Sequence, residues 1–326
     1  MENTVQSSLN YYDNEPERDA FLNDVTLGLQ KQAKELPCKY LYDERGSILF
    51  DKICELDEYY PTRTELNIMQ TYVDEIVARL GQNVLLIEYG SGSSLKTRVL
   101  LDNLSGLAGY IPIDISKEHL LNAAAKLKKI YPDLNVHPVC ADYTDLFRLP
   151  DDIPSSASRV VYFPGSTIGN FNPGDAVKFL HSINNIVGSS GQLLLGVDLK
   201  KDPNVLHRAY NDRSGITASF NCNILTRINR DLGANFNTEQ FKHYAFFNPS
   251  HGRVEMHIIS LADQTVQING STIKFATGES IHTESSYKYT VHEFTELAGK
   301  AGFTVERVWT DEDELFSVQL LRAGAS

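Results

Sequence analysis

Cysteine is scarce in this chain, and its four cysteines lie far apart. Cys38, Cys54, Cys140 and Cys222 form no CxxC pair, so the sequence favours neither a disulfide framework nor a zinc site. No apolar run approaches the roughly 20 residues that span a bilayer. The polar, acidic start of the chain lacks the apolar core of a signal peptide. We therefore expect a reduced, cytoplasmic protein that has no membrane partner.

Positive charge is also in short supply. Lys and Arg number 30 against 42 Asp and Glu, which gives a net charge of −12. Such a surface repels phosphate backbones, so we expect no nucleic-acid partner. No two histidines have the spacing of a metal site and no acidic facial triad is evident, so we expect no metal. We interpret the scattered histidines as surface or core residues: His137, His207, His243, His251 and His282.

Apolar residues make up 42% of the 326 residues, enough for a packed core and two domains. Helical patterns cover residues 15–35 and 46–80, with a break at Pro61. Five apolar stretches then predict strands: NVLLIEY, YIPIDIS, LNVHPVCADY, SRVVYF and GQLLLGVDL. Helical patterns over 96–104, 117–130 and 173–187 alternate with them. This alternation is typical of a parallel, doubly wound sheet.

The pattern changes after Asp198. Candidate strands in 200–288 are HYAFFN, RVEMHIISL and TVQINGSTIKF, and the last two alternate apolar and polar residues as antiparallel strands do. The tail returns to a helix over 291–300 and the strands FTVERVWT and LFSVQLLRA. We predict an α/β fold with a Rossmann-like domain from residues 64–199 plus 289–326. A second, mixed α+β domain is predicted from residues 1–63 plus 200–288.

Glycines and acids follow three of the predicted strands, where ligands of open α/β sheets bind. Gly90-Ser91-Gly92 follows the first strand, and its glycines allow the backbone to approach a ligand closely. Asp114 ends the next strand and suits the two hydroxyls of a ribose. Asp142 suits an adenine amino group, and Tyr143 suits the purine face. The alternatives are that the glycine loop is an ordinary turn between strand and helix, and that each acid caps a helix.

Both NAD and S-adenosylmethionine contain adenosine. The pyrophosphate of NAD favours a helix start with three close glycines, and this loop lacks the third. S-adenosylmethionine carries a sulfonium cation instead, which an acidic loop stabilises. We therefore predict S-adenosylmethionine, with Glu88 near its cationic part and Lys96 near its carboxylate.

The loop over residues 163–171 follows the fourth strand and faces the expected sulfonium. It contains Gly165, Gly169 and Asn170, whose amide offers both a donor and an acceptor. A methyl acceptor is expected here. The alternative is that Asn170 caps the helix that begins near Pro173.

Five segments together resemble the histidine-specific Nα-methyltransferases of ergothioneine biosynthesis. They are LYDERGS at residue 41, EYYPTRTE at 58, YGSGSSLKT at 89, GSTIGN at 165 and ESSYK at 284. The resemblance covers nearly the whole chain in the same order. It implies a methyltransferase domain, a substrate-binding domain and three transfers from S-adenosylmethionine to the α-amine of L-histidine, which give hercynine.

The resemblance also implies roles for single residues. Asn170 and Tyr210 would hold the histidine carboxylate, and Asn170 would orient the amine. Glu284 and Ser286 would bind the two imidazole nitrogens. Tyr59 would line the pocket. Apart from the resemblance, our hypothesis is that the amine binds in its neutral form or that water relays its proton, with assistance from Tyr42 or Tyr59. The remaining pocket walls would be Tyr42, Phe50, Gly165, Thr167 and Met256, and the cofactor site would be Glu88, Gly90, Ser91, Gly92, Lys96, Asp114, Asp142 and Tyr143.

Three alternatives remain open at this point. One is N-methylation of another aromatic amino acid, such as tryptophan or a derivative. An indole has one donor and no second polar ring atom, so a buried Glu284 would be left unsatisfied, whereas an imidazole suits Glu284 and Ser286 at i and i+2 of a strand. The others are a non-catalytic S-adenosylmethionine sensor and an RNA methyltransferase, which the net charge disfavours. We expect a monomer.

Overall fold

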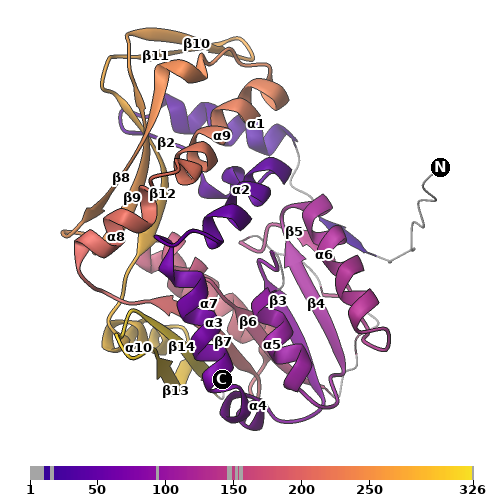
Figure 1. Cartoon of the computed structure of the whole chain (residues 1–326). Coiled ribbons are helices and arrows are strands. Elements are labelled where there is room, and N and C mark those ends of the chain that lie inside the picture. The colour runs from indigo at the N-terminus through magenta and orange to yellow at the C-terminus, as the bar shows by residue number, and fades with distance from the viewer. Residues whose placement is uncertain are drawn as a thin grey trace.

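The large sheet has the strand order β1-β5-β4-β3-β6-β7-β14-β13 (Figure 1). The computed structural model describes residues 11–14, 18–92, 95–144, 149–150, 153 and 157–324. The parallel strands, in chain order, are β1 (Tyr12–Asn14), β3 (Val84–Tyr89), β4 (Gly109–Asp114), β5 (Val139–Ala141), β6 (Ser158–Phe163) and β7 (Gln192–Asp198). The antiparallel hairpin β13 (Phe303–Thr310) and β14 (Phe316–Ala323) completes the sheet beside β7. The predicted α/β class is confirmed.

Helices cover both faces of this sheet, so β3 is buried at every residue and reads as a continuous apolar run. One face packs against α3 (Tyr60–Thr71), α4 (Val73–Leu80), α5 (Leu95–Asn103) and α6 (Lys117–Ile130). The other packs against α7 (Pro173–Val187) and α10 (Val291–Lys300). Because β3 has β4 on one side and β6 on the other, the strand order reverses between β3 and β6. Ligands of doubly wound sheets bind at such a reversal.

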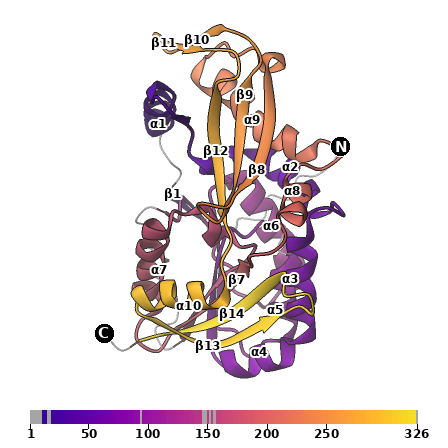
Figure 2. The same cartoon turned by 90° about the vertical axis from the view of Figure 1, so that its left-hand side faces the viewer.

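A smaller sheet has the order β2-β12-β9-β8. Its strands are β2 (Lys34–Glu35), β8 (Phe241–Asn248), β9 (Arg253–Ser260) and β12 (Ser280–Tyr287). Helices α1 (Arg18–Gln30), α2 (Glu44–Cys54), α8 (Pro203–Tyr210) and α9 (Ile216–Leu232) share a second apolar core with it. Figure 2 shows β12 running from this upper part of the molecule down towards β7. Short 3-10 turns are η1 (Cys38–Leu41), η2 (Thr167–Asn170) and η3 (Thr238–Gln240).

Several local predictions are wrong. The helix expected over 15–35 ends at Gln30, and Lys34–Glu35 form a strand; residues 15–17 lie outside the described residues. The segment 265–275 is a hairpin of β10 (Gln264–Ile268) and β11 (Ser271–Phe275), because Asn269 and Gly270 both adopt positive φ, 43° and 83°. The sequence patterns also missed α8, α9 and β12.

The domain boundaries stay a prediction. Strand β1 lies in the large sheet although the N-terminal segment was assigned to the second domain, and α3 crosses the boundary proposed at residue 64. None of the helices in the described parts of the chain has the length and hydropathy that a membrane span requires.

Candidate active site

A cavity of about 820 Å³ lies at the carboxyl ends of the parallel strands. Its walls come from both sheets, since the ends of β3, β4 and β5 face α1, α2 and β12 across it. It brings together ten of the residues singled out from the sequence: Tyr42, Phe50, Gly90, Gly92, Asp114, Asp142, Tyr143, Thr167, Asn170 and Glu284. Residues far apart in the chain therefore meet where the strand order reverses.

The loop after β3 turns through two glycines with positive φ, 71° at Gly90 and 43° at Gly92. A side chain at either position would strain the backbone. The amide of Gly92 lies 3.4 Å from Oδ2 of Asp114, and the amide of Ser116 donates to Oδ1 at 2.9 Å. Burial raises the pKa of Asp114. Residues 93 and 94, which the sequence motif includes, lie outside the described residues.

Asp142 follows β5 and is held from two sides. The amide and hydroxyl of Thr144 donate to its Oδ1 at 2.9 and 2.5 Å, and the Lys39 ammonium donates to Oδ2 at 2.9 Å. Burial raises the pKa of Asp142, but these contacts outweigh burial and leave it below the usual value. The ring of Tyr143 stacks on Tyr89 with centroids 5.4 Å apart. An acid and an aromatic face thus stand side by side at the cavity.

Four residues singled out from the sequence do not line the cavity or the smaller chamber described below. Glu88 faces away and accepts hydrogen bonds from the hydroxyls of Thr97 and Tyr110. Burial raises its pKa to about 8. Ser91 is buried, and Met256 belongs to the apolar core of the smaller sheet.

Lys96 is the fourth. Its ammonium pairs with Oε2 of Glu65 at 2.5 Å, and the amide of Gly165 donates to the same oxygen at 2.9 Å. Glu65 is fully buried in α3. In this structure the Lys96–Glu65 pair braces the loop after β6.

A chamber of about 30 Å³ adjoins the cavity. The two hollows share the side chains Tyr42, Phe50, Thr167, Asn170 and Glu284. The chamber also contacts Tyr59, Pro61, Gly165, Ser166, Asp198, Tyr210, Ser286 and Lys288. It is therefore the narrow inner end of the site, between the loop after β6 and strand β12.

The loop after β6 has an uncommon backbone. Gly165 and Ser166 have φ of 81° and 60°, and the Oγ of Ser166 accepts a hydrogen bond from the amide of Asp198 at 2.9 Å. Positive φ costs energy in a residue with a side chain, so the surrounding contacts hold this turn. The N-cap of α7 is Asn172, not Asn170. The capping alternative for Asn170 is therefore wrong, and Asn170 lines both hollows instead.

Strand β12 carries Glu284 and Ser286, which are 8% and 5% exposed and both line the chamber. The pairing of β12 with β9 is irregular between His282 and Glu284, and such a bulge re-aims the side chains that follow it. Met256 lies opposite Glu284 in the register. Burial raises the pKa of Glu284 to about 7, although Lys288 counteracts burial. A carboxyl group in this state is poised for a partner that donates a hydrogen bond.

A buried charge network, which the sequence analysis missed, supports this strand. Asp198, at the end of β7, pairs with Lys288 at 2.8 Å and with Lys201 at 2.5 Å, and it accepts from the hydroxyl of Tyr60 at 2.7 Å. Lys288 is only 1% exposed, and its ammonium also donates to Tyr210 at 3.0 Å and to Ser286 at 2.7 Å. The hydroxyls of Tyr210 and Ser286 lie 2.8 Å apart.

The charges of this network decide its protonation. Burial raises the pKa of Asp198, but Lys288 and Lys201 outweigh burial and lower it. Burial lowers the pKa of Lys288, but the Asp198 carboxylate outweighs burial and raises it. The Lys288 ammonium lines the chamber and favours a bound anion there. A lysine four residues after Glu284 in ESSYK is the only sequence signal of this network.

The raised pKa of Glu284 predicts a pH-dependent stability difference from Glu284→Gln. The folded state holds a proton more tightly than the usual pKa of 4.5 allows, so wild-type stability falls as the pH rises from about 4.5 to about 7. Glutamine does not titrate. We expect the variant's advantage in the free energy of unfolding to grow over this range and to level off above it, at about 3 kcal/mol or less. Its melting temperature should rise relative to the wild type over the same pH range.

Thermal unfolding of the ligand-free protein at several pH values measures this difference. Glu296, an exposed acid that pairs with His292, is the matched control when it is changed to glutamine. The stability difference between this control and the wild type should not reproduce the pH dependence expected of Glu284→Gln. A constant difference between wild type and Glu284→Gln at all pH values would contradict the raised pKa.

Comparison with known proteins assigns the chain to a family. Residues 21–323 match the family described as histidine-specific methyltransferase, SAM-dependent. The histidine N-alpha-methyltransferase of Mycolicibacterium smegmatis is 38% identical over 96% of this chain and 98% of its own. The Mycobacterium tuberculosis protein of that name is 38% identical over 92% and 94%. Ergothioneine biosynthesis protein 1 of Neurospora crassa is 30% identical over 86% of this chain. The matched region covers 32% of that longer protein.

These matches confirm the resemblance inferred from the sequence, the S-adenosylmethionine cosubstrate and the N-methyltransferase class. They do not favour a tryptophan-type substrate or a non-catalytic sensor. The family match covers almost the full length of the chain, and the cavity at the strand reversal is lined with acids. The chain therefore belongs to the histidine-specific, S-adenosylmethionine-dependent methyltransferases.

Proposed function

We propose that the protein transfers three methyl groups in succession from S-adenosylmethionine to the α-amine of L-histidine and releases hercynine. One observation carries the choice of ring. Glu284 and Ser286 are both buried on β12 and both line the chamber that adjoins the large cavity. An acid and a hydroxyl two residues apart on one strand match the donor and the acceptor of a neutral imidazole. We expect the protein to act as a cytoplasmic monomer on this small molecule alone.

The large cavity suits S-adenosylmethionine. The Asp114 carboxylate at the end of β4 would take the ribose hydroxyls, Asp142 the adenine amino group and Tyr143 the purine face. Gly90 and Gly92 have no side chain to block the methionine part, and the Ser91 side chain between them is buried. When bound, the sulfonium supplies an activated methyl group. Since Lys96 pairs with Glu65 and Glu88 accepts from Thr97, we assign neither residue to the ligand.

Lys288 gives the chamber its hydrogen-bonding polarity. Its three ammonium hydrogens go to Asp198, Tyr210 and Ser286. Both hydroxyl oxygens therefore accept from Lys288, and the Tyr210 hydroxyl in turn donates to Oγ of Ser286 at 2.8 Å. The Ser286 hydrogen would meet the bare ring nitrogen, and the Tyr210 hydrogen would turn from Ser286 to the substrate carboxylate when histidine binds. Glu284 would accept from the ring N–H.

The substrate amine arrives mainly as an ammonium, and each of the first two transfers forms another ammonium, so one proton must be lost before each of the three transfers. Burial, with Glu284 second, raises the pKa of Tyr42 well above its usual value, and burial likewise raises that of Tyr59. Neither hydroxyl ionises near neutral pH, so neither is a base in its own right. We assign them, with Asn170, to hold the amine in line with the methyl carbon, which is where most of the acceleration in such a transfer arises. The proton leaves through water.

Mass spectrometry of the reaction products tests the proposed function. Purified protein with L-histidine and S-adenosylmethionine is expected to form mono-, di- and trimethylated histidine in sequence, with hercynine as the final product. L-tryptophan and L-tyrosine under the same conditions are expected to remain unmethylated. Faster turnover of either of these, or an end product short of three methyl groups, would overturn it.

A further inference from the structure

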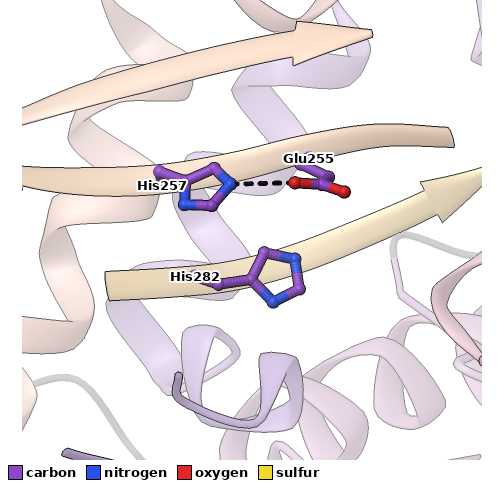
Figure 3. Close-up of side chains that lie close together, drawn as sticks. All are labelled: Glu255, His257 and His282. Carbon is purple, nitrogen blue, oxygen red and sulfur yellow. Dashed lines mark hydrogen bonds and ion pairs between the residues drawn. The ribbon is translucent and has the colours of Figure 1, made fainter. Parts of the chain in front are cut away.

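Three side chains with metal-binding groups meet on one face of the smaller sheet (Figure 3). Glu255 and His257 lie two residues apart on β9 and so share a face of the sheet. His282 of β12 lies opposite His257 in the register. A nitrogen of each imidazole and an oxygen of the carboxylate lie within 4.8 Å of one another. We propose that Glu255, His257 and His282 form a binding site for a divalent ion of the zinc class.

The strand geometry brings the three groups together. Residues two apart on a strand share a face, and directly opposed residues of antiparallel strands have neighbouring Cβ atoms. The two imidazole rings have centroids 5.1 Å apart, and Nε2 of His257 lies 3.1 Å from Oε2 of Glu255. Ligand atoms of a tetrahedral site with bonds of about 2.1 Å are about 3.4 Å apart. Modest side-chain rotations therefore close the site.

Further side chains already orient these groups. Arg253 and Asn248 donate to Oε1 of Glu255 at 2.8 and 3.0 Å, so Oε2 is the oxygen that faces His257. The hydroxyl of Ser285, which lies opposite Glu255 in the register, contacts Nε2 of His282 at 3.1 Å. Outer hydrogen bonds of this kind fix the ligands of natural metal sites.

The donor set selects the class of ion. Two imidazoles and one carboxylate suit zinc and its first-row neighbours, whereas magnesium and calcium prefer oxygen alone. His282 and Ser285 also line the large cavity, which leaves an approach from that side and room for a water as fourth ligand. Sequence spacing gave no sign of this site, because the two histidines meet only through the pairing of β9 with β12.

An ion at this place would join β9 to β12 beside the irregular pairing that precedes Glu284. Ion binding to the folded state alone raises its stability. Zinc is therefore expected to raise the melting temperature of the wild-type protein. Neither this site nor its test depends on which amine the enzyme methylates.

Calorimetric titration of tag-free, chelator-treated protein with zinc chloride, without histidine present, tests the site. We expect one saturable ion per chain, and cobalt in its place should give visible d–d absorption of a four-coordinate site. His282→Ala and His257→Gln should each weaken zinc binding by at least about 10-fold and abolish the rise in melting temperature. His251→Ala, at an exposed turn next to the same strands, is the control and should bind as wild type.

A far-ultraviolet circular dichroism spectrum and a cooperative thermal transition like those of the wild type, both measured without zinc, show that the two variants are folded. Zinc binding that is absent from the wild type would overturn the proposal. So would binding that persists at full strength in the two folded variants.

Discussion

Replacement of Glu284 by alanine is expected to lower kcat/KM for L-histidine by at least about 100-fold. Glu284 is 8% exposed and lines the chamber, so a ring N–H that enters there would lose its acceptor and stay desolvated. A lost hydrogen bond to a charged group together with an unsatisfied buried donor amounts to about 3 kcal/mol. That is roughly a factor of 100 in the specificity constant.

Affinity for S-adenosylhomocysteine should change little, because Glu284 belongs to the smaller sheet, whereas Asp114 and Asp142 lie at the ends of strands of the large sheet. Glu296→Ala, on the exposed face of α10, is the control and should retain wild-type kinetics. Glu284→Gln retains one oxygen acceptor, so it should fall between wild type and alanine. Full activity of Glu284→Ala with L-histidine would refute the assignment of this side chain to the imidazole.

The sequence contained enough information for the large sheet. Buried parallel strands are continuous apolar runs, and the helices over 117–130 and 173–187 are found with those bounds. The smaller sheet was harder, because its elements depend on contacts remote in sequence. Strand β12 ends in TESSY, which has little apolar signal, and the strand is buried only because β9, β2 and η2 surround it. Helix α9 contains three asparagines, Asn221, Asn223 and Asn229, which helix propensity alone does not favour.

The site was foreseen residue by residue only where a motif pointed to it. Asp114, Asp142 and Tyr143 follow strands, so position alone placed them at the cavity. Glu88 shows the limit of that rule. It also stands at a strand end, but side chains alternate along a strand, and Glu88 turns to the face of α5 while Tyr89 turns to the other. Lys96 forms an ion pair with Glu65, and no pattern in the sequence indicates this pairing.

The Asp198–Lys288 pair lay beyond sequence reasoning for a different reason. Asp198 ends β7 of the large sheet and Lys288 follows β12 of the smaller one, so the pair exists only once both sheets are in place. It ties the two sheets together at the inner end of the site. Because a buried ion pair is costly to desolvate and adds little stability on average, its value here lies in fixing Tyr210 and Ser286.

Lys288→Met is therefore expected to raise KM for L-histidine by about 30-fold or more, with a smaller effect on kcat. Methionine matches the length of the lysine stem but donates no hydrogen bond, so the hydroxyls of Tyr210 and Ser286 lose the donor that orients them and keep only the hydrogen bond between themselves. The chamber also loses a positive charge that favours the substrate carboxylate. Losses of about 2 kcal/mol for a buried charged hydrogen bond correspond to this factor.

Asp198 keeps Lys201 and Tyr60 in this variant, so the fold should survive, and an unchanged affinity for S-adenosylhomocysteine would show it. Lys200→Met, which removes an exposed lysine paired with Glu293, is the matched control and should leave KM unchanged. Ser286→Ala should raise KM as well, and the double variant should cost less than the sum of the two single changes, since both act on one hydrogen-bonded unit. If the two effects were fully additive, Lys288 would act on the substrate independently of Ser286, and the polarity assigned to the chamber would be wrong.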